Sequence, residues 1–173
     1  MRGGNRGDAS RIAGRGHEHG DSTREQKTKE RDGEGHLYTR IMIPVDLAHL
    51  DRLGRALQTG ADLAKHYGAG ITYVGVTGVQ PSKVAHTPKE FEHKLAAFAK
   101  EQGDAAGISA EGKAIIAHDP AVELDHMLVD AAEEIGADLI VVGTHDPHTF
   151  DWPHHGGKLA NHAKCSVMLV RDR

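Results

Sequence analysis

The chain has little of what several classes of protein require. It contains one cysteine, Cys165, in 173 residues, which excludes an internal disulfide framework. Its first residues, MRGGNRGDASRIAGRG, include no apolar signal core, and no later apolar run approaches the length of a membrane span. The formal net charge of -4 gives no positive excess to attract nucleic acid or an anionic membrane. We therefore expect a cytoplasmic protein whose partners include neither a nucleic acid nor a membrane.

Large apolar residues are also scarce at the start of the chain. Residues 1–36 contain only Met1 and Ile12 of this kind, against eight glycines, eight Lys or Arg and seven Asp or Glu. Such a segment cannot offset the entropy of its own ordering by burying apolar surface. The composition predicts a disordered tail over residues 1–36 and one folded domain over residues 37–173.

From Leu37 onward, short apolar runs alternate with longer stretches in which apolar residues recur at helical spacing. The runs predict strands at 40–46, 71–79, 112–119, 137–145 and 165–171. The stretches predict helices at 50–64, 91–102, 124–135 and 156–163. This alternation is typical of an α/β fold with a parallel sheet.

Asp46 and three glycines lie where predicted strands and helices meet their loops. Asp46 directly follows the first strand, at the carboxyl edge where open α/β sheets place ligands, so its target would be a ribose or an adenine edge. An aspartate in this position also serves as a cap of the next helix. Gly143 ends the fourth strand, and Gly156 and Gly157 precede the last helix, so both margins of that loop can bring N–H groups to a phosphate. Glycine pairs before helices also form plain turns.

Three separated blocks of sequence resemble a known family. They are IMIPVD at the start, AEEIGADLIVVGTH before the loop and NHAKCSVMLVR at the end. In this order, over most of residues 38–171, they resemble the universal stress protein family. The resemblance implies a five-stranded, doubly wound parallel sheet of the adenine-nucleotide alpha hydrolase type. It also implies a homodimer through the last strand and binding of ATP or AMP, with Mg²⁺ only as a companion of the nucleotide.

The resemblance assigns several residues to the adenosine. It implies that Asp46 contacts the adenosine, that Val45 and Val76 frame the adenine from the strand ends, and that Pro44 belongs to the same nucleotide-binding set. The two valines are explained equally well as core residues of strands that are buried on both faces.

The phosphate side of the family pattern is only partly present. That pattern is glycine, two residues, glycine, nine residues, then glycine followed by serine or threonine. Gly143 and Gly156 stand at the first and third positions, and His145 opens an HDP turn similar to that of one subgroup. Asp146 replaces the middle glycine, and Gly157 replaces the hydroxyl residue. A carboxylate there repels phosphates by about 1 kcal/mol, so we expect AMP or ADP as readily as ATP.

Histidines are concentrated in the same loop and suggest a metal site as an alternative to nucleotide binding. With Asp146 and Asp151, they could form a zinc or nickel site of a metal-dependent hydrolase: His145, His148, His154, His155 and His162. No nucleophile with a neighbouring base and no paired catalytic carboxylates accompany them. The other alternative is a dimeric interaction protein without nucleotide, which Asp146 and Gly157 favour. We predict an adenine-nucleotide-binding stress-response regulatory module with an unidentified protein partner, neither a dedicated enzyme nor a protein with a resident metal.

Overall fold

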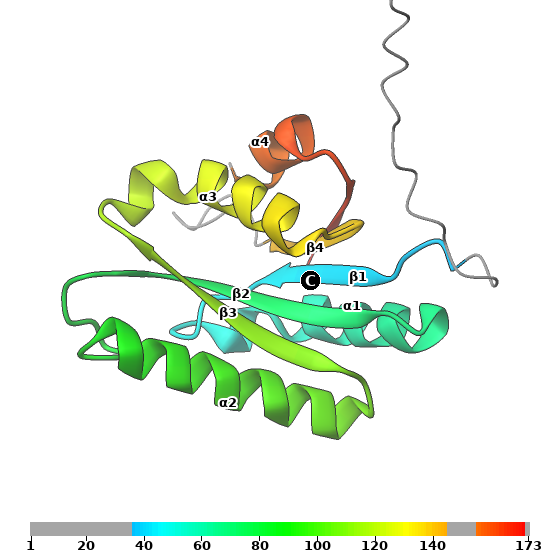
Figure 1. The fold of residues 1–173 in the computed structure, drawn as a ribbon, viewed down its shortest axis with the longest axis horizontal. Coiled ribbons are helices and arrows are strands. Elements are labelled where there is room, and N and C mark those ends of the chain that lie inside the picture. The colour runs from blue at the N-terminus through cyan, green and yellow to red at the C-terminus, as the bar shows by residue number, and fades with distance from the viewer. Residues whose placement is uncertain (1–35, 145–154, 172–173) are drawn as a thin grey trace, which may run out of the picture. The chain divides into compact units, whose positions relative to one another are not determined.

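The computed structural model describes residues 36–144 and 155–171, which contain a five-stranded parallel sheet (Figure 1). The strands are β1 (Arg40–Pro44), β2 (Gly70–Gly78), β3 (Ala110–Ala117), β4 (Leu139–Thr144) and β5 (Ser166–Arg171). They lie in the order β3-β2-β1-β4-β5, and every neighbouring pair is parallel. The expected doubly wound parallel sheet is thereby confirmed. The predicted disordered tail, apart from His36, falls outside the described residues.

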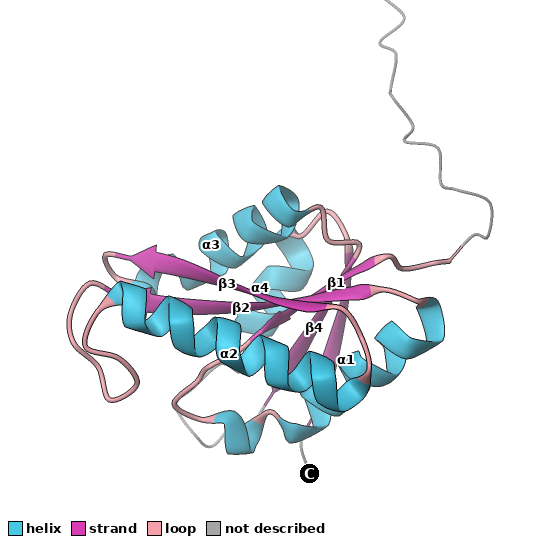
Figure 2. Cartoon of the chain, turned by 60° about the horizontal axis from the view of Figure 1, so that its bottom comes forward, coloured by secondary structure: helices cyan, strands magenta, loops and turns pink. Residues whose placement is uncertain are grey.

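Helices cover both faces of this sheet (Figure 2). One face carries α1 (Gly54–Tyr67) and α2 (Pro88–Ala106), and the other carries α3 (Pro120–Ile135) and α4 (His155–His162). A short 3-10 helix, η1 (Leu50–Arg52), precedes α1. The side chain of Thr87 accepts a hydrogen bond at the start of α2, and Gly68 and Gly107 end α1 and α2 with φ of 63° and 67°. Within the two described segments, no helix is long and apolar enough to cross a membrane.

Successive side chains of a strand point to opposite faces of the sheet, which divides the core into two clusters. Ile41 and Ile43 of β1 pack on the side of α1 and α2, whereas Met42 between them packs on the side of α3 and α4. Leu128 of α3 and Leu159 of α4 belong to this second cluster, and all five side chains are at most 1% exposed. Burial on both faces explains why these strands are nearly continuous apolar runs in the sequence.

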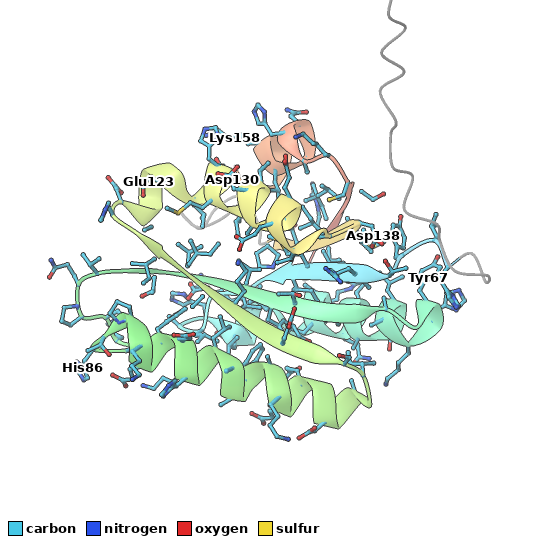
Figure 3. The ribbon with its side chains drawn as sticks, in the orientation of Figure 1. Tyr67, His86, Glu123, Asp130, Asp138 and Lys158 are labelled. Carbon is cyan, nitrogen blue, oxygen red and sulfur yellow. The ribbon has the colours of Figure 1, made fainter. Side chains whose placement is uncertain are left out.

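Asp138 joins the amino-terminal ends of β1 and β4, and Figure 3 labels it there. Its Oδ2 accepts hydrogen bonds from the N–H and the hydroxyl of Thr39 at 2.8 and 2.7 Å. Its Oδ1 accepts one from the N–H of Arg40 at 3.1 Å. The N–H of Asp138 in turn donates to the carbonyl of Arg40 at 3.0 Å. Because β4 begins at the next residue, Asp138 fixes the central strand pair at the end of the sheet opposite to the strand tips.

The loop between β2 and α2 is held by its own side chains, and His86 in Figure 3 marks its position. The hydroxyl of Ser82 accepts a hydrogen bond from the N–H of Val84 at 3.2 Å. The carboxylate of Glu90 accepts one from the N–H of His86 at 2.8 Å and lies 2.6 Å from Nζ of Lys94, which also donates to the carbonyl of Val84. The hydrogen bond from Lys94, followed by the one from His86, lowers the pKa of Glu90. The loop is therefore held by hydrogen bonds within itself and to the first turns of α2.

Burial of Tyr73 leads to a prediction at alkaline pH. The side chain is 1% exposed and meets Phe98 edge to face, with ring centres 5.2 Å apart. Burial raises the pKa of Tyr73 to about 12, from 10.0. Because the folded pKa lies above the unfolded one, the stability from this group is complete below pH 10 and is lost as the pH rises towards 12. We expect Tyr73→Phe to flatten the fall of the unfolding free energy over this range in urea titrations, and a slope equal to that of the wild type would contradict this.

Candidate functional site

The sheet changes its winding direction between β1 and β4. From β1 the chain proceeds outward through β2 to β3, whereas β4 and β5 extend the sheet on the other side of β1. The pairs Ile41 with Leu139 and Met42 with Ile140 set the register of the central strands. Continued to the strand tips, this register brings Val45 beside Gly143. The carboxyl ends of β1 and β4 thus meet at a topological switch point, the place where open α/β sheets bind ligands.

Asp46 follows β1 at this switch point and is engaged by its own loop. Its Oδ1 accepts a hydrogen bond from the N–H of Ala48 at 2.8 Å, and its Oδ2 lies 2.7 Å from Nδ1 of His49. The side chain of Asp46 is 36% exposed and that of His49 46%. Asp46 therefore forms the local turn that aspartate often forms after a strand, and part of its carboxylate remains exposed. His49 was not predicted as the partner of Asp46. The spacing of three residues could have indicated this contact.

Gly143 allows a close contact between β4 and α1. A Cβ at this position would lie 2.9 Å from Cδ2 of Leu53 and 3.2 Å from Cβ of Ala56. Such distances are shorter than ordinary carbon contacts, so the missing side chain lets the start of α1 approach the strand end. Packing accounts for this glycine whether or not a phosphate lies nearby.

The three apolar residues expected around the adenine differ in their surroundings. Pro44 is buried at the end of β1, and Val45 is 2% exposed within the cluster on the side of α1 and α2. Val76 of β2 is half-buried and packs against the cluster on the side of α3 and α4. The two valines thus belong to the core on opposite faces of the sheet, and their contacts do not bring them together around one ligand.

The expected phosphate side is only partly described. α4 begins at His155, so Gly156 and Gly157 lie within its first turn. The first N–H groups of a helix lack intrahelical acceptors and can bind an anion. A Cβ at Gly157 would meet no atom of the described residues within 4 Å, so packing does not explain this glycine. His145 and Asp146 belong to residues 145–154, which are outside the described residues.

Two further chemistries concern the residues of the alternative metal site and the thiol of Cys165. Three histidines of the proposed metal loop, His145, His148 and His154, lie outside the described residues. Across segments 36–144 and 155–171, no group of three or more His, Cys, Asp or Glu side chains is arranged to hold a metal ion. At Cys165, burial and secondly the charge of Asp138 raise the pKa of the thiol, which disfavours the nucleophilic thiolate.

The strand order defines a doubly wound α/β domain, and its central strand tips lie at the edge where open sheets of this kind bind ligands. Over residues 37–171 the chain matches the Universal stress protein family. The chain belongs to this family. The likeness stated for three short blocks of sequence therefore extends over the whole folded domain.

Solved structures of universal stress proteins have the same fold. One from Burkholderia pseudomallei is 22% identical, with a TM-score of 0.60 and a match over 79% of this chain and 98% of that one. A universal stress protein in complex with cAMP is 21% identical, with a TM-score of 0.56 over 78% and 97% of the two chains. One from Archaeoglobus fulgidus in complex with dAMP is 20% identical, with a TM-score of 0.56 over 77% and 98%. A comparison with curated proteins found no match.

Proposed function

We propose that this domain binds an adenine nucleotide at the tips of β1 and β4 and acts as a stress-response regulatory module in the cytoplasm, without a dedicated catalytic activity. The observation that carries the proposal is the half-exposed carboxylate of Asp46 at the topological switch point. A carboxylate there accepts hydrogen bonds from ribose hydroxyls. Relatives with the same fold in complex with cAMP and dAMP support an adenine nucleotide as the ligand.

The phosphate side favours AMP or ADP at least as much as ATP. In the proposed site, Gly143, Gly156 and Gly157 offer N–H groups, and His145 adds a polar side chain. Asp146 places a negative charge where the family pattern has a glycine. Each added phosphate increases the repulsion, and any Mg²⁺ would accompany the nucleotide.

Calorimetry with AMP and ATP tests the proposal. Tag-free protein should bind AMP with one site per chain, and Asp146→Gly should tighten ATP binding about five- to tenfold, because it removes roughly 1 kcal/mol of repulsion. The affinity for AMP should change less. Absence of heat with either nucleotide, together with no nucleotide released from freshly purified protein in mass spectrometry, would overturn the proposal in favour of a nucleotide-free interaction protein.

We also propose that the domain forms a homodimer through β5. This strand pairs only with β4 in the described sheet, and it exposes Met168 to 37% and Leu169 to 47%. An exposed apolar edge strand pairs readily with a second copy of itself. In light scattering, the wild type should have about twice the chain mass of 18.6 kDa, and Leu169→Lys should halve that value. Ile116→Lys, at the opposite edge on β3 where Ile116 is 53% exposed, is the matched control and should remain dimeric.

A further inference from the structure

The contact between α3 and α4 combines an apolar centre with an ion pair. Leu128 of α3 and Leu159 of α4 are both 1% exposed and belong to one cluster. Beside them, Nζ of Lys158 lies 3.3 Å from Oδ2 of Asp125, whose side chain is only 11% exposed. Figure 3 shows Lys158 on α4 above the ribbon of α3. The two helices are thus fixed relative to each other by packing and by charge.

Two histidines lie near each other across this helix pair. The rings of His126 on α3 and His162 on α4 have centres 6.3 Å apart and planes inclined by 45°. Both residues are exposed, so neither ring is needed to fill the core. No apolar or hydrogen-bonding requirement in the described contacts explains why two imidazoles meet at this point.

The separation of the rings is close to that of two imidazoles on one metal ion. An imidazole nitrogen binds Zn²⁺ at roughly 2.0–2.1 Å, which places the ion about 3.2 Å from the ring centre. At the tetrahedral angle that Zn²⁺ prefers, the two ring centres would therefore be about 5.2 Å apart. The observed 6.3 Å is about 1 Å longer. Exposed side chains can rotate to close this difference without moving either helix.

We infer that His126 and His162 form a binding site for a divalent transition-metal ion, Zn²⁺, Ni²⁺ or Cu²⁺, with water at the remaining positions. Neutral imidazoles are good ligands for all three ions. The site has only two protein ligands, in keeping with the absence of a larger metal cluster in the described part of the chain. An open site of this kind exchanges its ion freely, and we expect micromolar affinity.

Nearby charge favours a cation at this position. The cation of Lys158 would repel a metal ion, but the carboxylate of Asp125 neutralises it at 3.3 Å. Asp130 lies one helical turn after His126 and so on the same side of α3. Its carboxylate, labelled in Figure 3, adds a negative charge to this surface. The ion would join α3 to α4 and hold the helix that begins at His155 more firmly on the sheet.

Zinc titration of tag-free protein tests this inference. The chain has 14 histidines, so binding at the other histidines has to be distinguished by variants. His126→Ala, His162→Ala and the double variant should each lose the same single binding event, or bind that ion at least tenfold more weakly. The losses should not add up, because both side chains serve one ion. His93→Ala, at an exposed histidine on α2, is the matched control and should bind as the wild type does.

Thermal unfolding gives a second readout. Zinc should raise the Tm of the wild type and of His93→Ala by the same amount, and raise it clearly less in the three variants that lack one or both ligands. Without metal, all variants should match the wild type in circular dichroism and Tm, because the replaced side chains are exposed. Equal zinc stoichiometry and affinity in all variants, or two independent and additive losses, would overturn the inference.

Discussion

Asp46→Ala is expected to abolish measurable binding of AMP while leaving the domain folded. The carboxylate is proposed to accept hydrogen bonds from the ribose, and a hydrogen bond to a charged group contributes about 1.5–3 kcal/mol. The loss of one such bond weakens binding roughly ten- to hundredfold, and the loss of two exceeds the range of ordinary calorimetry. Stability should fall by only about 1 kcal/mol, because the two local contacts of Asp46 are partly exposed.

Matched variants separate the charge of Asp46 from its role in the turn. His49→Ala removes the partner at 2.7 Å but keeps the carboxylate, so AMP affinity should stay within a few fold of the wild type. Asp51→Ala removes another exposed acidic side chain in η1 and should have no effect on binding. Wild-type affinity in Asp46→Ala would show that the nucleotide, if bound, lies elsewhere.

Asp138→Ala is expected to cause the largest loss of stability, about 2–4 kcal/mol in urea unfolding. The substitution removes an acceptor from the N–H and hydroxyl of Thr39 and from the N–H of Arg40. These hydrogen bonds join the starts of β1 and β4. Their loss therefore weakens the pairing of the two central strands, on which both halves of the sheet are built. AMP affinity should be retained at temperatures where the variant is folded, because the substitution lies at the end of the sheet opposite to the proposed site.

Two milder variants separate the hydrogen bonds of Asp138 from its charge. Thr39→Val removes only the hydroxyl donor and should cost about 1 kcal/mol. Asp138→Asn keeps one acceptor oxygen but loses the charge that helps to raise the pKa of Cys165, so the thiol should react faster with a disulfide reagent at pH 8. If Asp138→Ala lowers the free energy of unfolding by less than about 1 kcal/mol, this carboxylate does not fix the central strand pair as described.

The fold was predictable because most of its elements depend on local patterns. The strands that are buried on both faces stand out as apolar runs, as in IMIP and LIVV. Several boundaries were less accurate. The helices expected at 91–102 and 124–135 are longer in the structure, where α2 spans Pro88–Ala106 and α3 begins at Pro120. The first helix was expected from Leu50, whereas α1 begins at Gly54, since the turn fixed by Asp46 and His49 leads first into η1. The third strand was expected at 112–119, whereas β3 spans Ala110–Ala117, because its pairing with β2 already begins at Ala110.

The candidate site was less predictable, since it depends on contacts between distant segments. Asp46 could be placed at a strand tip from sequence order alone, because the position follows an apolar run. The packing of α1 on Gly143 could not, since it depends on how Leu53 and Ala56 approach β4. Likewise, the pairing of His126 with His162 depends on the packing of α3 against α4, and nothing in the spacing of the two residues indicates it.

The contacts that Ser82, Glu90 and Lys94 make in the loop after β2 have a thermodynamic consequence for recognition. A loop that is already held by its own hydrogen bonds loses little conformational entropy when a molecule binds beside it, so more of the contact energy remains as affinity. Amide hydrogens of Val84 and His86 would then exchange slowly with solvent before any ligand is added, and saturation would change their rates only slightly.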